Sequence, residues 1–203
     1  RKAVFEIERA GETRIRPCRC NRCQTKGWRG FLYTLQRSLV DAPMLGSHLV
    51  ISALQRRGVT TLFSLSGNQI MPLYDACIDA GIRIVHVRHE AAAVYMADAW
   101  AQVTGELGVA LLTAGPGLTN AVAALYAAAQ AESPVLLLSG DSARAEDGLG
   151  AFQEMDQAAI TAPVTKRSHR VASRAELAVA VDEAAAQALA PRPGPVHLAL
   201  PAD

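Results

Sequence analysis

The chain has 203 residues, of which 50% are apolar and 5% are aromatic, a size and composition that suit one α/β domain with a sizeable core. Its formal net charge of +1 gives no electrostatic case for nucleic acid or a membrane surface as the main partner. With no apolar run long enough to span a bilayer and no secretory signal pattern, we expect a cytoplasmic protein.

Residues 1–43 differ from the rest because they are rich in arginine and show no sustained apolar period. We expect an irregular basic arm there, whether native or a remnant, and one domain over residues 44–203. Cys18, Cys20 and Cys23 could offer thiolates to zinc, but the next cysteine or histidine is His48. A basic arm is therefore the preferred interpretation of this segment.

The first half of the domain alternates helices and strands. Apolar spacing from Gly46 predicts a helix that stops at Gly58, and a second helix over 72–80 stops at Gly81. Cys77, on this second helix, is expected to be a buried small hydrophobe. The β-rich runs over 60–65 and 82–87 predict strands.

The same alternation continues to the end of the chain. Ser173 with Glu176 forms a capping-box pattern that starts the last predicted helix. The predicted helices span 90–103, 118–131 and 173–190, and the predicted strands span 107–114, 134–141, 164–171 and 193–201.

Strands that alternate with helices, several as continuous apolar runs, predict a three-layer α/β fold. Its sheet should be six-stranded and mostly parallel, with helices on both faces. Ligands of such sheets bind at the carboxyl ends of the strands. Functional residues are therefore expected in three loops at those ends: 66–69, 88–90 and 114–120.

Glu90 places a carboxylate at a strand end, where it also heads a helix. An acidic residue in the first turn improves helix electrostatics, so for an isolated glutamate the structural explanation is preferred. The order of the motifs along the chain, in which Glu90 belongs to one, decides between the two interpretations.

The segment from Thr113 to Asn120 combines a strand end, a glycine turn and a helix start. Glycines let a backbone approach a ligand closely, and a helix start favours negative charge. The segment is close to the dinucleotide fingerprint, except that Asn120 replaces the third glycine; Asp141 would be the ribose partner. The other interpretation is a tight turn in which Pro116 fixes the chain. No GxSxG motif supports hydrolase chemistry.

Six motifs in order resemble the N-terminal pyrimidine-binding domain of thiamine-diphosphate enzymes of the acetolactate synthase type, a group that includes oxalyl-CoA decarboxylase and benzaldehyde lyase. The resemblance covers about 46–203. Its carriers are LVISALQRRGVTTLFSLSGNQI, VRHEAAAVYMADAWAQVTG, TAGPGLTNAVAAL, PVLLLSGD, AFQEMDQAAITAPVTKRSHRV and RPGPVHLALPAD.

The resemblance implies that Glu90 is catalytic, hydrogen-bonding a ring nitrogen of the cofactor's aminopyrimidine so that the cofactor can generate its carbon nucleophile. It also assigns cofactor contacts to the loop of Ser66 and Gly67, where Ser66 departs from the family's proline. Pro116 and Asn120 are further expected cofactor contacts.

Two glutamines are implied to face the substrate. Gln69 falls where benzaldehyde lyase places a substrate-facing histidine, so the donor can differ from pyruvate. Gln153 matches a family glutamine near the reacting centre. A loop-anchoring amide is the other interpretation of Gln153.

The family binds the diphosphate through Mg²⁺ in a separate domain, with a GDG motif followed by an asparagine. Gly140-Asp141-Ser142 matches this only in part, and no asparagine follows Asn120. The resemblance therefore implies a diphosphate-binding domain from another subunit, in a homodimer or higher oligomer, and no activity of this chain alone. Either truncation or a split enzyme would explain the missing motif.

Three functions follow as hypotheses. The first is the pyrimidine-binding half of an enzyme acting on a small-molecule 2-oxo acid or related acyl donor. The alternatives are a dinucleotide-binding domain and a non-catalytic truncated paralogue.

Overall fold

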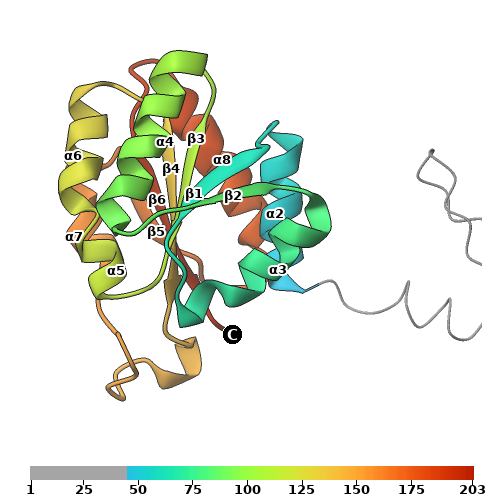
Figure 1. Ribbon diagram of the computed structural model, residues 1–203. Coiled ribbons are helices and arrows are strands. Elements are labelled where there is room, and N and C mark those ends of the chain that lie inside the picture. Colours follow the sequence, from blue (N-terminus) through green and yellow to red (C-terminus); the bar gives the residue numbers. More distant parts are fainter. Residues whose placement is uncertain (1–44) are drawn as a thin grey trace, which may run out of the picture. The chain divides into compact units, whose positions relative to one another are not determined.

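A computed structural model describes residues 45–203, and these form one six-stranded sheet with helices on both faces (Figure 1). All five strand pairings are parallel, in the order β2-β1-β3-β4-β6-β5. The predicted α/β fold is thereby confirmed. The strands are β1 Thr61–Ser64, β2 Arg83–His86, β3 Gly108–Leu112, β4 Val135–Asp141, β5 Arg167–Arg170 and β6 Val196–Pro201.

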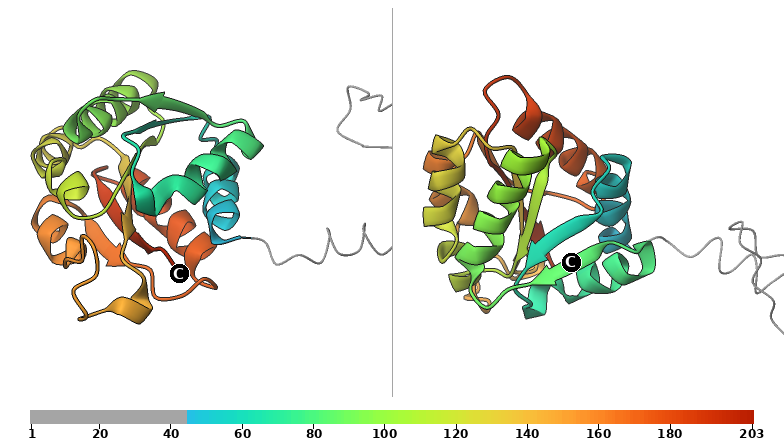
Figure 2. Two further views of the ribbon diagram at one scale, coloured as in Figure 1. Left: turned by 60° about the horizontal axis from the view of Figure 1, so that its bottom comes forward. Right: turned by 45° about the horizontal axis from the view of Figure 1, so that its top comes forward.

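The helices form two layers, one on each side of the sheet (Figures 1 and 2). One layer contains α2 Gly46–Arg56, α3 Met71–Ala80 and α8 Leu177–Leu189. The other contains α4 Glu90–Thr104, α5 Pro116–Thr119, α6 Val122–Gln130 and α7 Gln157–Thr161. Short 3₁₀ turns lie at Asn68–Ile70, Arg144–Glu146 and Ala162–Val164.

The central strands β3 and β4 are buried along their whole length, as their apolar runs predict. Successive side chains of a strand point to opposite faces. Leu111 accordingly packs in the core under α2, α3 and α8, whereas Leu112 packs in the core under α4 and α6. The sheet therefore separates two apolar cores.

Several predicted ends hold, whereas the last two strands begin three residues later than predicted, at Arg167 and Val196, and two predicted helices also differ. Gly81 ends α3 in the left-handed conformation at φ 70°, as predicted. The single helix predicted over 118–131 is two helices, because the Ala121 N–H bonds the Leu118 carbonyl and tightens the chain into a turn. The last helix begins at Leu177 and not at Ser173.

Glu176 explains that late start. Its carboxylate accepts the Ala172 N–H at 2.8 Å and lies 2.6 Å from His169 Nε2. These contacts, the Ala172 N–H first, lower the pKa of Glu176. The carboxylate thus binds the chain before the helix, and the residues between form a turn.

Helix α4 lies unusually close to strand β3. A Cβ added at Gly108 would lie 2.0 Å from the Ala97 carbonyl oxygen, so only glycine fits there. Phe63 of β1 and Trp100 of α4 add a tilted ring contact at 6.2 Å. These contacts place the start of α4 relative to the sheet.

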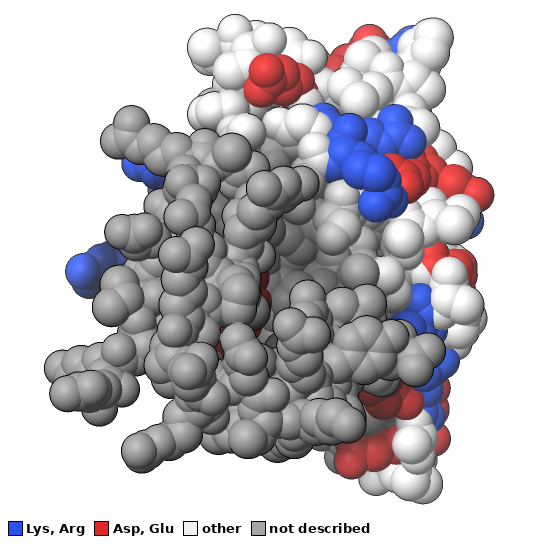
Figure 3. All heavy atoms as spheres, turned by 90° about the vertical axis from the view of Figure 1, so that its right-hand side faces the viewer, with Lys and Arg blue, Asp and Glu red and all other residues white. Residues whose placement is uncertain are grey.

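Cys77 is buried as predicted, and burial raises the pKa of its thiol to about 12. His86, in contrast, lies on the edge strand β2 and is exposed, so it is not a core residue. The predictions for Cys18, Cys20 and Cys23 lie outside the described residues. Within residues 45–203, no helix has both the length and the apolar character needed to cross a membrane. Where described residues form the face in Figure 3, basic and acidic side chains lie beside one another.

Candidate active site at the carboxyl edge of the sheet

The loops that follow β1, β2, β3 and β4 all leave the carboxyl edge of the sheet, which Figure 2 (left) turns toward the viewer. In a parallel sheet this edge collects the loops and helix starts that bind ligands. The three loops chosen from the sequence are therefore brought to one edge, together with the long loop over 142–156.

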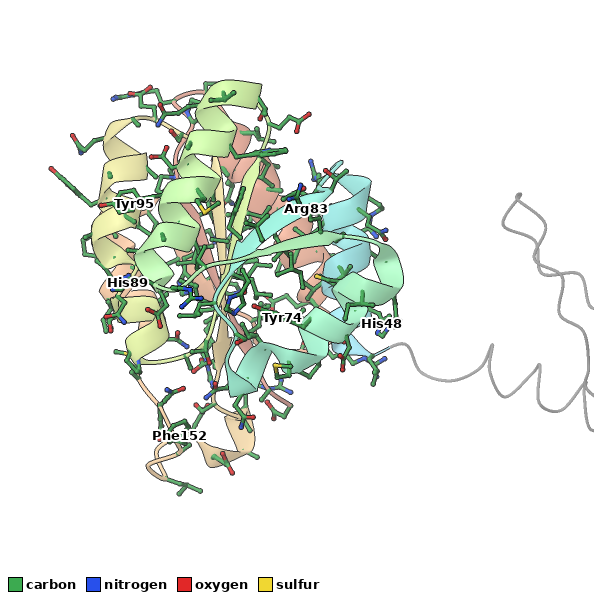
Figure 4. The ribbon with its side chains drawn as sticks, viewed as in Figure 1. His48, Tyr74, Arg83, His89, Tyr95 and Phe152 are labelled. Carbon is green, nitrogen blue, oxygen red and sulfur yellow. The ribbon has the colours of Figure 1, made fainter. Side chains whose placement is uncertain are left out.

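Glu90 is the first residue of α4 and is partly buried. His89 caps the helix from an extended conformation, and its Nδ1 accepts the Ala91 N–H at 3.2 Å (His89 is labelled in Figure 4). The unpaired N–H groups of a helix start favour a carboxylate. The backbone thus holds Glu90 at the end of β2 with its side chain toward the loop after β3.

Asn120 meets Glu90 from that loop. Its Nδ2 donates to Glu90 Oε2 at 3.0 Å, across 30 residues of sequence. Glu90 Oε1 faces Gly117, where an added Cβ would lie 4.0 Å away. Within residues 45–203 no hydrogen bond reaches Oε1. One carboxylate oxygen is therefore held by the protein, and the other is available to a ligand.

A second cluster joins three amide and hydroxyl side chains. Thr113 Oγ1 donates to Gln69 Oε1 at 2.5 Å, and Gln69 Nε2 donates to Gln153 Oε1 at 3.0 Å. These bonds connect the loops after β1, β3 and β4. The side-chain carbonyl of Gln153 is the acceptor in the second bond, and its amide N–H groups take part in neither bond.

Glycines let these loops approach one another. A Cβ at Gly67 would lie 2.3 Å from Thr113 Cβ, and one at Gly117 would lie 2.6 Å from Thr113 Cγ2. Gly115 has φ +60° and lies against Gln153, with 2.9 Å between its ideal Cβ and Gln153 Cβ. Thr113 thus stands between the Glu90 pair and the glutamine pair.

Two residues singled out from the sequence lie apart from these clusters. Ser66 is exposed, and its Oγ is 3.5 Å from His86 Nε2. The ring of Pro116 is also exposed, while its carbonyl accepts the Asn120 N–H at 3.0 Å. Thr113 begins the candidate segment predicted from the sequence but is assigned no contact there, although its position at the end of a buried strand is a usable signal.

Asp141 is not available to a ribose. It is 2% exposed, and Arg170 Nε donates to its Oδ2 at 2.5 Å. The ribose partner required by the dinucleotide-binding alternative is therefore already paired within the protein.

A hollow of about 540 Å³ lies beside the loop over 142–156, and Glu90 does not line it. Its lining is formed by Asp141, Ser142, Asp147, Glu154, Met155, Asp156 and Arg170. Glu90, which is partly buried, lies on another part of the carboxyl edge.

Fold and site together define a parallel α/β domain with a helix-start carboxylate and glycine turns at the carboxyl edge of its sheet, the edge where domains of this kind bind ligands. Residues 44–160 match the family described as "Thiamine pyrophosphate enzyme, N-terminal TPP binding domain". The chain belongs to this family of thiamine pyrophosphate enzymes, and the resemblance seen in its motifs is confirmed.

Similar proteins include 2-hydroxyacyl-CoA lyases and acetolactate synthases. The chain is 43% identical to 2-hydroxyacyl-CoA lyase 2 of Danio rerio and 40% identical to that of Homo sapiens, over 86% of this chain and 28% of each relative. It is 37% identical to the acetolactate synthase large subunit of Lactococcus lactis, over 83% of this chain and 30% of the relative. The chain thus spans less than a third of the length of these relatives.

Proposed function

We propose that this chain is the pyrimidine-binding part of an enzyme that uses thiamine diphosphate to break or form a carbon–carbon bond of an acyl donor. The observation that carries the proposal is Glu90, a helix-start carboxylate with one oxygen held by Asn120 and the other without a hydrogen bond within residues 45–203. Family membership supports this choice of cofactor.

The residues around Glu90 fit a planar ring with nitrogen acceptors. Oε1 can share a proton, and Gly117 keeps the space beside that oxygen free of a side chain. Thiamine diphosphate, when bound, supplies a carbon nucleophile that attacks a carbonyl group. Gly67 and Asn120, with the backbone at Pro116, are the proposed contacts to the cofactor, and Ser66 would contact it from the rim.

Glu90 has the catalytic role in this proposal. It would hold a proton at Oε1 and share it with a pyrimidine nitrogen, while the Asn120 amide keeps Oε2 in place. Fixing one oxygen orients the other, which reduces the conformational freedom lost when the ligand binds. Asn120 is thereby a positioning residue for Glu90.

We propose a 2-oxo acid or a related acyl donor as the substrate class. The greater identity to 2-hydroxyacyl-CoA lyases than to acetolactate synthases favours a 2-hydroxyacyl thioester as the donor. Gln153 would donate an amide N–H to an oxygen of the acyl substrate, because the side-chain carbonyl of Gln153 already accepts a hydrogen bond from Gln69. Comparing kcat/KM for a 2-hydroxyacyl-CoA and for pyruvate tests this preference.

A second domain would complete the site. It would hold the diphosphate through Mg²⁺ and cover the open edge near Glu90, in a homodimer or higher oligomer. Helices α4 and α6 expose large apolar side chains that a partner would bury, namely Tyr95, Met96, Val103 and Tyr126. Tyr95 is labelled in Figure 4.

The decisive test is Glu90→Gln in the chain assembled with a diphosphate-binding domain. Deuterium exchange at the thiazolium carbon of bound cofactor, followed by NMR, should fall by at least about a hundredfold, the usual contribution of a general acid–base group. Glu106→Gln is the matched control, since Glu106 is an exposed glutamate at the other end of α4. An unchanged exchange rate in Glu90→Gln would overturn the assignment.

Calorimetry separates this proposal from its alternatives. Thiamine diphosphate with Mg²⁺ should bind the assembled protein, and NAD should not. Tight NAD binding would favour a dinucleotide-binding domain. Cofactor binding with no thiazolium exchange in the unaltered protein would favour a non-catalytic paralogue.

A further inference from the structure

The loop over 142–156 carries one proposed substrate contact in an unfavourable backbone conformation. Gln153 lies in this loop with φ 63°, in the left-handed region that non-glycine residues avoid. Its side chain nevertheless packs on Gly115 and accepts from Gln69. Something must hold the backbone of Gln153 in this unfavourable conformation.

The carboxylate of the next residue, Glu154, binds the preceding part of the loop. Its Oε1 accepts the Gly148 N–H at 2.5 Å, and its Oε2 accepts the N–H groups of Gly150 and Ala151 at 2.9 and 3.0 Å. Three charge-assisted bonds therefore close a small ring of residues 148–154 around one side chain. These N–H donors also lower the pKa of Glu154.

Two glycines of this ring direct their backbone N–H groups toward its centre, where the Glu154 carboxylate accepts them. Gly148 and Gly150 both have φ 75°, which turns their N–H groups toward the carboxylate. Phe152, labelled in Figure 4, is 75% exposed and so adds little packing that could fix the loop. The conformation of this ring thus depends on polar bonds more than on apolar burial.

The start of the loop is fixed separately. Arg170 of β5 donates Nη1 and Nη2 to the two carboxylate oxygens of Asp147, at 2.8 and 2.9 Å, and Nε to Asp141. This fork joins the beginning of the loop to the sheet. Between Asp147 and α7, the loop is held by the ring of hydrogen bonds that Glu154 closes.

We propose that Glu154 is a positioning residue, whose carboxylate holds residues 148–153 in the conformation that presents Gln153 to Gln69 and to the substrate. The part that concerns the substrate rests on the proposed function. Glu154 does not touch the reacting atoms; it acts through the backbone of Gln153.

Glu154→Gln tests the proposal with little risk to folding, because Glu154 lies in a loop outside both apolar cores. One acceptor oxygen becomes an amide donor, so at least one backbone N–H loses its partner. Hydrogen–deuterium exchange of the chain should become at least about tenfold faster over 148–153 and stay unchanged in α4. Glu146→Gln is the control in the same loop, because the Glu146 side chain has no hydrogen bond within the described part of the chain.

Kinetics of the assembled enzyme then separate positioning from general support of the fold. Glu154→Gln should lower kcat/KM for the preferred donor about tenfold, as expected for losing a charged hydrogen bond. In a Gln153→Ala background the same change should have almost no further effect, because Glu154 acts through Gln153.

Two results would overturn the inference. One is unchanged amide exchange over 148–153 in Glu154→Gln, and the other is an equal loss of kcat/KM with and without Gln153. If the proposed function is wrong, a different measurement shows it: the rate of thiazolium exchange in Glu90→Gln equals that of the unaltered enzyme. Amide exchange of this loop needs no bound cofactor and reports on Glu154 in either case.

Discussion

Asn120 donates its side-chain amide to Glu90 Oε2 at 3.0 Å, joining the loop after β3 to the first residue of α4. The bond links two residues that the motifs place in separate segments. It means that the orientation of the carboxylate depends on the turn between α5 and α6, where Asn120 lies.

Removing the Asn120 amide should reduce the proposed catalytic effect of Glu90 while the Glu90 carboxylate itself stays present. We expect Asn120→Ala to slow thiazolium exchange in the assembled enzyme about tenfold, because losing a hydrogen bond to a charged group costs about 1.5–3 kcal/mol. Thr119→Ala is the control, since the Thr119 side chain donates to the Pro116 carbonyl and not to Glu90. An Asn120→Ala rate equal to that of the unaltered enzyme would show that Glu90 needs no such support.

The Arg170 fork should matter more for stability than the surface pairs. Asp141 is 2% exposed, so Arg170→Met leaves a buried carboxylate without its guanidinium and should lower the free energy of unfolding by about 3 kcal/mol. Arg56→Met should cost less than about 1 kcal/mol, because Arg56 is 54% exposed and Arg57 still pairs with Asp182.

Chemical denaturation of the chain measures both variants. Adding Asp141→Asn to Arg170→Met should recover part of the loss, since the buried charge is then removed. Equal losses for Arg170→Met and Arg56→Met would contradict the view that burial of Asp141 makes the difference.

His197 should make the chain sensitive to mild acid. It is fully buried, Ser139 Oγ lies 2.8 Å from its Nε2, and Ser168 Oγ and Thr161 Oγ1 lie 2.8 and 2.9 Å from its Nδ1. Burial lowers the pKa of His197 from 6.5 to about 3. Below pH 6.5 the unfolded chain therefore binds a proton that the folded chain does not, and stability falls until the pH approaches 3.

The pH window from about 6 to 5 separates the effect of this histidine from that of the acidic groups. The acidic groups with lowered pKa values, such as Glu176 and Asp182, lose their contribution only nearer their unfolded values of 4.5 and 3.8. The free energy of unfolding should fall by up to about 1.4 kcal/mol per pH unit. In His197→Gln the slope in this window should disappear, even if the variant is less stable throughout; parallel slopes would refute the assignment.

The sequence predicts much of this fold because its strongest signals are local. The apolar runs that become β3 and β4 are buried along their length, and Gly81 ends α3 where a left-handed residue is needed. Glu90 could be placed at the carboxyl edge for the same reason, since a strand and then a helix flank it in the sequence. What made it a site residue was its order among the other motifs.

Long-range partners could not be predicted in this way. Gln69 and Gln153 are 84 residues apart, and their bond depends on a left-handed backbone at Gln153 that its residue type does not suggest. Glu176 fits a capping box in sequence, yet its carboxylate binds Ala172 and His169. Such choices are made by tertiary contacts that compete with local preference.

The close approach of Gly108 to the Ala97 carbonyl also bears on how this domain can diverge. Because that contact fixes α4 against the sheet, the backbone at Glu90 is held by the core and not by the loop over 142–156. We therefore expect that this loop can change in sequence while the start of α4 keeps its place. Divergence of the loop would then leave both apolar cores unchanged.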